Sequence, residues 1–343
     1  MQNSAVLYRK SLHGRRPQNA IAAPPAESVR DYILTSEISR WQAEWFDDCR
    51  TRRLSQDTLD LRETILRLLC EFLDAKGLTV CGPDEARKFM LHLATSGRRQ
   101  GNNPLASSTI KTYRDHLVIF FKFLLMHRIV TVSPMASTIA PAVRKSKITP
   151  FTAEQIKSMI DAAKHGYFPK RDRAIILLFL DTGMREAELA GLKWGDLDLI
   201  SRRCSVVGKG NKPRDVYFSA TTYRAITEYR RDETSANEDS ETPLFYSDRG
   251  RKTGTGISES GLLQLVHRLG DRAGVTGVRC SPHTFRHTFA LNFLRSGGDV
   301  FALKDALGHE DIKMTMVYVK MASSDHRRQH LAHSPVEFML RGK

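Results

Sequence analysis

The chain has 343 residues and a formal net charge of +15. Its length is sufficient for about two domains with buried cores, and its basic character indicates a polyanionic partner. The most apolar run, residues 117–126, is interrupted by Lys122 and is too short to span a bilayer, which argues against a membrane partner. The five cysteines lack a Cys-x-x-Cys pair and the N-terminus lacks a hydrophobic signal sequence, so we expect a cytoplasmic protein with reduced thiols.

Residues 1–30 combine Arg15 and Arg16 with three prolines and many small residues. A segment of this composition cannot bury enough apolar surface to offset the entropy lost on ordering. We therefore expect residues 1–30 to form a flexible basic arm.

Residues 31–133 show the periodicity of amphipathic helices, with apolar residues at spacings of three and four. The third helix is predicted to begin at Pro83 and to end before Ser96. The fourth is predicted to take Ser107 or Ser108 as its N-cap. Four short helices of this kind predict a small helical bundle.

Residues 134–150 have little periodicity and are predicted to be a linker. They include the cations Arg144, Lys145 and Lys147. A basic linker between two basic domains suits a clamp around a duplex, although a plain solvated tether has the same composition.

Residues 151–343 are predicted to form a mainly α second domain with one small antiparallel β-sheet. Thr152 is its first N-cap, and residues 232–256 are polar and glycine-rich, which favours a long surface loop. Two strand-like runs at 204–207 and 216–218 flank a turn rich in Gly, Lys and Asn. Further helices are predicted at 174–180, around Arg185 and Glu188, and near 258–272, 283–295 and 299–307.

Arg185 lies where a helix is predicted to start after a glycine turn, in the segment Thr182-Gly183-Met184-Arg185. The amides of a helix start and a guanidinium together favour a phosphate at this position. Glu188, three residues later, lies on the same helical face and can hold a charged neighbour in one rotamer. Taken alone, the same two residues are more typical of an exposed intrahelical ion pair.

Lys209 lies in the turn between the two predicted strands, in Gly208-Lys209-Gly210-Asn211-Lys212. A flexible ammonium at such a tip can reach into a groove and give a proton to a departing sugar oxygen. Lysines at hairpin tips also serve solubility alone. Lys212 and Arg214 are close enough in sequence to be confused with Lys209.

A Ser-Pro pair before His283 predicts a helix start that places His283 and Arg286 on one face. That face offers an imidazole for proton transfer and a second guanidinium for a phosphate. His283 and His287 also have the i, i+4 spacing of zinc ligands. The zinc alternative is disfavoured because Thr replaces the Glu of a zinc protease helix, and no Cys or carboxylate cluster completes a site.

His309 follows Gly308 at the predicted end of a helix, from which its side chain can project. Tyr318 comes nine residues later among apolar neighbours. Taken alone, such a tyrosine is more typical of a core residue with a satisfied hydroxyl. Together with two guanidiniums, an ammonium and imidazoles, however, its phenol is a nucleophile suited to a phosphodiester. This chemistry requires neither metal nor ATP, and the chain has no Walker loop.

Four segments, in their order and spacing, resemble the signature boxes of the tyrosine recombinases, the family of phage integrases and Xer-type enzymes. The resemblance spans residues 150–325. It implies a two-domain clamp, with an N-terminal helical core DNA-binding domain over 31–133 and a catalytic domain with a C-terminal tail over 151–343. The four segments are Thr182-Gly183-Met184-Arg185, Gly208-Lys209-Gly210-Asn211-Lys212, His283-Thr284-Phe285-Arg286-His287-Thr288, and Leu307-Gly308-His309 followed by Tyr318.

The resemblance also implies a role for each residue of the expected site. Arg185 and Arg286 would stabilise the transition state, and Lys209 would be the general acid toward the 5′-oxygen. The remaining roles are proton transfer by His283, a hydrogen bond from His309 to a phosphate oxygen, support of the site by Glu188, and nucleophilic attack by Tyr318. Candidate DNA contacts outside this set are Lys111, Arg114, Arg144, Lys145, Lys147, Lys212 and Arg214.

The expected activity is site-specific recombination of double-stranded DNA through a 3′-phosphotyrosyl intermediate, without a cofactor. We expect a homotetramer on paired sites, with or without accessory proteins. The apolar tail would dock on a neighbouring protomer or pack in cis. Two alternatives are a type IB topoisomerase-like nicking and closing enzyme and a catalytically idle DNA-binding regulator of the same fold. Neither the DNA site nor the biological task, such as integration, excision, dimer resolution or transposition, follows from the sequence.

Overall fold

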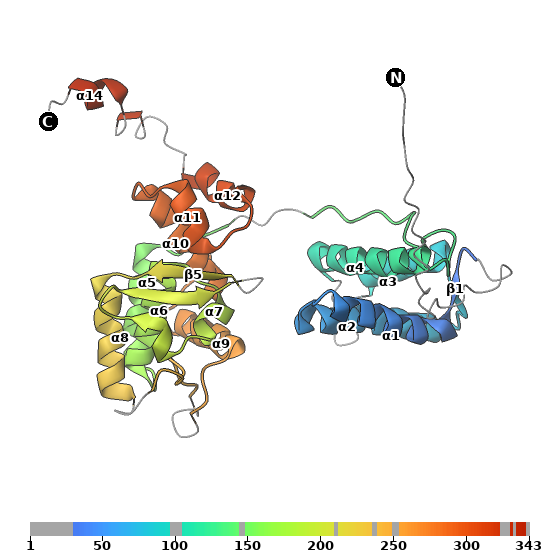
Figure 1. The fold of residues 1–343 in the computed structure, drawn as a ribbon, viewed down its shortest axis with the longest axis horizontal. Helices are drawn as coiled ribbons and strands as arrows, with labels where there is room; N and C mark the ends of the chain where they lie inside the picture. Colours follow the sequence, from blue (N-terminus) through green and yellow to red (C-terminus); the bar gives the residue numbers. More distant parts are fainter. Residues whose placement is uncertain are drawn as a thin grey trace, which may run out of the picture. The chain divides into compact units, whose positions relative to one another are not determined.

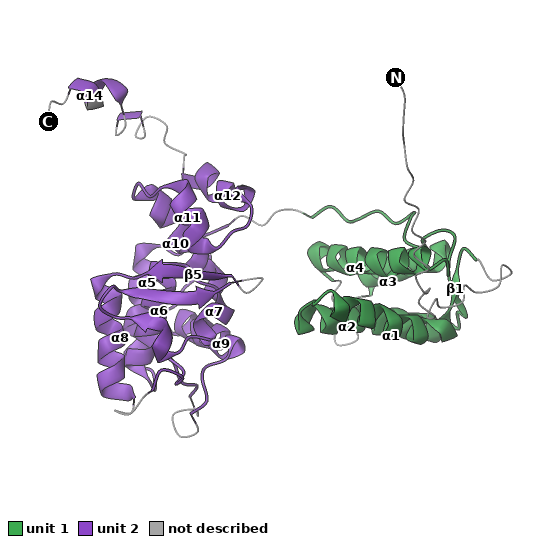
Figure 2. Cartoon of the chain, in the orientation of Figure 1, with its two compact units in different colours: residues 1–145 green, residues 146–343 purple. Residues whose placement is uncertain are grey.

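The computed structural model describes residues 30–96, 105–143, 148–208, 212–234, 239–248, 254–322, 330–331 and 334–340. The chain divides into two compact units, unit 1 (Met1–Lys145) and unit 2 (Ser146–Lys343) (Figure 2). The division falls inside the segment predicted to be a linker. Of the predicted arm only Arg30 is described, and the linker cations Arg144, Lys145 and Lys147 lie outside the described residues.

The described part of unit 1 is a bundle of four helices, as predicted, with a two-stranded antiparallel sheet beside it (Figure 1). The sheet was not predicted, because each of its strands has only two residues. The helices are α1 (Thr35–Thr51), α2 (Gln56–Ala75), α3 (Pro83–Thr95) and α4 (Ser107–Met126), and the strands are β1 (Ile33–Leu34) and β2 (Val80–Cys81).

The core of unit 1 forms where the apolar stripes of these helices meet. Trp45 of α1 packs against Phe120 of α4 with the ring centroids 5.1 Å apart. Helix α3 has the predicted bounds, but the predicted cap of α4 was wrong. The N-cap is Ala106, whose carbonyl already accepts the amide of Ile110, so Ser107 is the first helical residue. Burial of the shared apolar faces, more than helix propensity, stabilises helices of this length.

Unit 2 is mainly α-helical with one small antiparallel sheet, and the predicted fold class is confirmed. Its elements are α5 (Ala153–Ala163), α6 (Pro169–Thr182), α7 (Glu186–Ala190), the 3-10 helix η2 (Trp194–Asp196), β3 (Leu197–Asp198), β4 (Arg203–Val207), β5 (Pro213–Tyr217), α8 (Ala220–Glu233), α9 (Glu259–Arg272), α10 (Pro282–Arg295), α11 (Val300–Leu307), α12 (Ile312–Ala322) and α14 (Pro335–Leu340).

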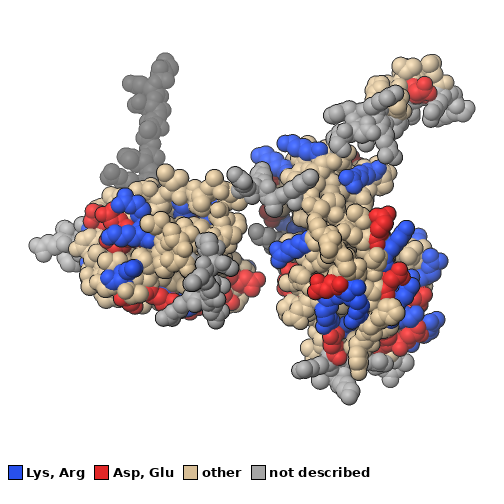
Figure 3. All heavy atoms as spheres, turned by 180° about the vertical axis from the view of Figure 1, so that it is seen from behind, with Lys and Arg blue, Asp and Glu red and all other residues tan. Residues whose placement is uncertain are grey.

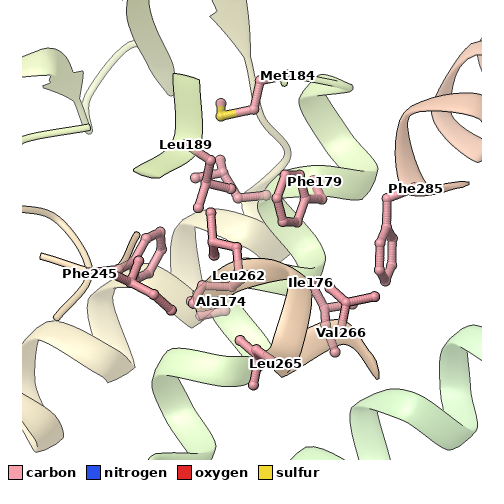
Figure 4. Packing of buried hydrophobic residues seen from close by; sticks show 14 of the residues in the cluster. Ala174, Ile176, Phe179, Met184, Leu189, Phe245, Leu262, Leu265, Val266 and Phe285 are labelled. Atoms are coloured by element: carbon pink, nitrogen blue, oxygen red, sulfur yellow. The ribbon is translucent and has the colours of Figure 1, made fainter. Parts of the chain in front are cut away.

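Helix α10 joins two apolar clusters of unit 2. On one face, Phe285 stacks on Phe179 of α6 with the ring centroids 5.8 Å apart, inside the main core that α9 completes with Leu262 and Leu265 (Figure 4). On another face, Leu291 packs into a smaller cluster with residues of α11 and α12. Because α10 is held on both sides, the polar residues that it carries between these faces have fixed positions.

Strands β3, β4 and β5 form an antiparallel sheet in that order. The predicted strand at 216–218 begins earlier, because Pro213 already pairs with Val207. The predicted surface loop at 232–256 was wrong in two respects. Helix α8 continues to Glu233, and the loop buries Leu244 and Phe245 in the main core. Two apolar residues in an otherwise polar segment gave too little periodicity to predict this burial.

None of the helices in the described ranges is both long enough and apolar enough to cross a bilayer.

Gly183 ends α6 and determines the path of the chain toward Arg185. Its φ of +59° is the left-handed conformation, which glycine adopts without strain. A Cβ at this position would lie 2.2 Å from Cδ1 of Phe289 on α10, so the packing of Phe289 also requires glycine here. Gly183 is therefore the C-cap of α6 and also the point at which the backbone closely approaches Phe289.

We expect Gly183→Ala to destabilise unit 2 by about 2–5 kcal/mol, which combines a left-handed backbone cost of about 1–2 with an overpacking cost of about 1–3. Gly274→Ala is the matched control, because Gly274 has a φ of +65° and no atom within 4 Å of its Cβ position. Urea unfolding of both variants measures the difference. An equal loss in the two variants would contradict the close contact.

Candidate active site

Arg185 is the N-cap of the short helix α7 and is held by Glu188. Its backbone amide donates to Oε2 of Glu188 at 2.8 Å, and its Nη1 donates to Oε1 at 2.9 Å. Its Nη2 donates to the carbonyl of Gly308 at 3.2 Å. The Arg185–Glu188 pair is therefore not the exposed ion pair of the alternative interpretation, because the Glu188 side chain is only 3% exposed.

Glu188 binds a second guanidinium, that of Arg214 on β5. The two Nη atoms of Arg214 donate to the two carboxylate oxygens at 2.7 and 2.8 Å, and its Nε donates to the carbonyl of Ala306. Burial alone would raise the pKa of Glu188, but the hydrogen bonds from Arg214 and from the Arg185 amide hold it below its ordinary value. Arg214, expected as a DNA contact, is thus occupied in tying the sheet to α7 and to the end of α11.

Arg286 of α10 is buried, and two backbone carbonyls hold it. Its Nη1 donates to Gly183 at 2.7 Å and its Nη2 to Leu307 at 2.6 Å. Burial, together with the positive charge of Arg185, lowers the pKa of Arg286 to about 10. Among the described residues it forms no ion pair with a carboxylate, so its charge favours an incoming anion.

His309 follows the left-handed cap at Gly308 and turns inward. Its Nδ1 and the hydroxyl of Thr315 on α12 are hydrogen-bonded at 2.9 Å. Burial, and then the charges of Arg286 and Arg185, lower the pKa of His309 to about 4. His309 is therefore neutral at physiological pH, and one of its ring nitrogens remains for a phosphate oxygen.

Tyr318 lies on α12, beside the residues already described. It is 5% exposed, and its ring is nearly parallel to that of His309, with an interplanar angle of 9° and centroids 6.5 Å apart. Burial raises the pKa of Tyr318, and the charge of Arg286 opposes this rise. Its hydroxyl and Nδ1 of His287 are hydrogen-bonded at 2.7 Å. The phenol and the buried guanidinium are thus brought together within one chain.

Of the two remaining predicted catalytic residues, the structure describes His283 but not Lys209. His283 is exposed in the first turn of α10. Lys209 lies outside the described residues, but its neighbours Gly208 and Lys212 line a cleft of about 750 Å³. Arg185, Lys304 and His309 line the same cleft. Gly208 and Lys212, the described residues on either side of Lys209, therefore lie at the edge of the site.

The sequence interpretation missed two contacts. Arg214 was expected as a DNA contact, and His287 was weighed as a zinc ligand and appeared in the third segment without a catalytic role. The spacing gave no signal for either, because each contact joins elements far apart in sequence. In the part of the chain that the structure describes, no group of three or more His, Cys, Asp or Glu residues is arranged to hold a metal ion.

Of the other described candidate DNA contacts, Lys212 is exposed in unit 2, and Lys111 and Arg114 lie in unit 1. Lys111 pairs with Asp115, and Arg114 donates to the carbonyl of Thr138 at 2.7 Å while contacting the same aspartate. Over the face of unit 2 seen in Figure 3, acidic and basic residues alternate across the lower half. Basic residues predominate at the upper end, where Figure 1 places α11 and α12. Helix α12, at that end, carries Tyr318.

The model of the phage integrase family matches residues 150–325, which is more than half of the chain. The chain belongs to this family of tyrosine recombinases. It is similar to tyrosine recombinase XerC of Vibrio vulnificus (strain YJ016), at 30% identity over 78% of this chain and 80% of that protein. It is also similar to XerC of Lactobacillus delbrueckii subsp. bulgaricus (strain ATCC BAA-365 / Lb-18), at 31% identity over 73% of this chain and 82% of that protein.

Solved structures of other recombinases share the fold of this tyrosine recombinase. The Tn1549 transposon integrase in complex with circular intermediate DNA has a TM-score of 0.65 at 20% identity, covering 82% of this chain and 94% of that chain. A lambda integrase dimer bound to a COC′ core site has a TM-score of 0.64 at 17% identity, covering 80% and 96%. The resemblance predicted from the four segments is confirmed, and the protein is a tyrosine-type site-specific recombinase.

The lowered pKa of His309 makes the stability of the recombinase pH-dependent. The folded state keeps this imidazole neutral down to a pH of about 4, whereas the unfolded chain protonates it near its ordinary pKa of about 6.5. Unfolding is therefore favoured as the pH falls below about 6.5. We expect the free energy of unfolding of unit 2 to fall more between about pH 7 and pH 5 in the native protein than in His309→Gln.

Chemical denaturation at the two pH values measures this difference. Any other group that titrates in this range contributes in both proteins, so the difference between them isolates His309. An identical loss in the native protein and in the variant would contradict a buried neutral imidazole.

Proposed function

We propose that Tyr318 is the nucleophile that attacks the scissile phosphodiester. The proposal rests on one observation above all: the phenol lies within one chain beside His309 and close enough to Arg286 for that charge to affect its pKa. The full catalytic set would be Arg185, Lys209, His283, Arg286, His309 and Tyr318, with Glu188 in support.

The proposed reaction is a direct displacement at phosphorus. The phenolic oxygen of Tyr318 forms a bond to phosphorus while the bond from phosphorus to the 5′-oxygen breaks, and Lys209 protonates the departing oxygen. Arg185 and Arg286 bind the non-bridging oxygens, on which charge accumulates in the transition state. Since the phenol is also a tolerable leaving group, the 3′-phosphotyrosyl bond stores the energy for religation, and no ATP or metal is needed.

Double-stranded DNA is the proposed substrate. The similar Tn1549 transposon integrase is in complex with circular intermediate DNA, the similar lambda integrase dimer is bound to a COC′ core site, and this chain carries a net charge of +15. We propose that residues 31–133 form the core DNA-binding domain, that 134–150 is the linker and that 151–343 is the catalytic domain. Lys111 and Lys212 remain proposed phosphate contacts, as do Arg144, Lys145 and Lys147. We also propose that the enzyme acts in the cytoplasm, which its five free cysteines support.

We expect Tyr318→Phe to abolish the denaturation-resistant complex between protein and DNA. The variant keeps the aromatic ring and loses only the attacking oxygen, so the non-covalent dissociation constant should change by less than about twofold. Tyr167→Phe is the matched control, because Tyr167 is 91% exposed in the same unit and lies outside the proposed site. Denaturing gel electrophoresis after incubation with DNA that carries the sequences flanking this protein's own gene measures the covalent complex of both variants. A covalent complex that persists in Tyr318→Phe would refute the assignment.

We propose that the recombinase acts as a homotetramer on paired sites and that its C-terminal tail docks on a neighbouring protomer. The tail residues Val336, Met339 and Leu340 are exposed, which leaves apolar surface for a partner to cover. Removal of residues 332–343 should prevent tetramer assembly on DNA, measured by analytical ultracentrifugation, while cleavage of a single site persists. Unchanged assembly and recombination would remove the trans-docking proposal.

A further inference from the structure

The hydroxyl of Tyr318 has one described hydrogen-bonding partner, and that partner is outside the catalytic set that the sequence predicts. Nδ1 of His287 lies 2.7 Å from the phenolic oxygen. The two rings are 5.7 Å apart between centroids and inclined at 49°, so the contact is made edge to edge through the polar atoms. Helices α10 and α12, which carry the two residues, pack against each other.

His283 is placed differently from His287 on the same helix. It lies one turn earlier, is exposed, and makes no hydrogen bond within the described residues. His287 is half-buried and directly follows Arg286, whose guanidinium is fixed by two carbonyls. The position of His287 is thus determined by the same helix that fixes the proposed phosphate-binding arginine.

We propose that His287 is a catalytic residue whose Nδ1 takes the proton of the Tyr318 hydroxyl during strand cleavage and returns it during religation. This inference rests on the proposed role of Tyr318 as nucleophile. It assigns the proton on the nucleophile side of the reaction, whereas Lys209 is proposed to act on the leaving-group side.

The proton and the electron pairs balance in both directions. In cleavage the O–H bond of Tyr318 breaks, its proton moves to Nδ1 of His287, and the released electron pair forms the bond to phosphorus. The electron pair of the broken bond stays on the 5′-oxygen, which Lys209 protonates. In religation the imidazolium of His287 returns its proton to the departing phenolate, while Lys209 accepts the proton of the attacking 5′-hydroxyl.

The surroundings of His287 keep it ready to accept a proton. Burial, and then the charges of His283 and Arg286 on its own helix, lower its pKa, so the imidazole is neutral at physiological pH. From α12 the group that faces it is Tyr318, whose ring is also nearly parallel to that of His309. A neutral imidazole has one nitrogen without a proton, and a phenol is the better hydrogen-bond donor of the two groups. The transfer becomes favourable only as the phenolic oxygen bonds to phosphorus, so it is concerted with attack.

Substitution by Asn separates proton transfer from positioning. The side-chain oxygen of Asn stands at the same number of bonds from Cα as Nδ1 of His, so it can accept the hydroxyl hydrogen bond but cannot take the proton. We expect His287→Asn to form the covalent complex about 10²–10⁴ times more slowly than the native protein at neutral pH. His287→Gln, which also lacks a basic nitrogen, replaces it if the Asn variant does not fold. His267→Asn on the exposed side of α9 is the matched control and should react at the native rate.

A substrate with sulfur in place of the bridging 5′-oxygen shows whether His287 acts on the proton of the nucleophile or on that of the leaving group. A thiolate leaves without protonation, so this substrate removes the need for Lys209 and leaves the nucleophile side unchanged. With it the native rate should be constant above the pKa of His287 and fall at lower pH. His287→Asn should lack that plateau and accelerate about tenfold per pH unit as phenolate accumulates. The control variant His267→Asn should keep the plateau.

Two results would overturn the proposal. A native rate for His287→Asn on ordinary DNA would reduce His287 to a residue that only positions the phenol. A slow His287→Asn that regains the native rate on the sulfur substrate would move His287 to the leaving-group side. Failure of the proposed function is a separate result: the native protein would then form no covalent complex, or mass spectrometry would find the DNA attached to a residue other than Tyr318.

Discussion

The central constraint of this recombinase is the buried charge of Arg286. Two carbonyls, one at the end of α6 and one at the end of α11, hold this guanidinium where water is excluded, and the described residues supply it with no ion-paired carboxylate. A cation in this state is costly until an anion arrives. The helix ends that bind it must therefore be fixed, which explains why left-handed glycine caps terminate both α6 and α11.

Glu188 provides the carboxylate partner for two other arginines of the site, Arg185 and Arg214. One buried carboxylate binds Arg185 and Arg214 and leaves their other contacts directed to backbone carbonyls. As a result, α7, the sheet and the end of α11 meet at a single group. The tertiary contact also fixes β5, the strand that follows Lys209 in the sequence, because Arg214 lies on it. Arg185 and Arg214 thus share one carboxylate, and Arg286 has no ion-paired carboxylate among the described residues, so the three arginines keep a net positive charge that favours an anion such as a phosphate.

Tyr318 is a buried core residue and also the proposed nucleophile. Tyr318 is buried, as expected of a core tyrosine, and its hydroxyl is hydrogen-bonded to His287. The groups around the ring distinguish the proposed nucleophile from an ordinary core tyrosine. Arginine and two imidazoles beside a phenol provide both the charge and the proton acceptor that phosphoryl transfer needs.

The sequence alone determined the family, the helical character of both units and the four signature segments. Helix periodicity, glycine caps and motif spacing are local properties, which is why the sequence is sufficient for them. It predicted Thr152 as a cap, the bounds of α3 and the turn before Arg185 for the same reason. Only the tertiary structure decided that Arg214 binds Glu188, that Leu244 and Phe245 are buried, and that His287 rather than His283 contacts Tyr318. Those outcomes depend on how helices pack across long separations in sequence, and a single chain carries no local signal for such packing.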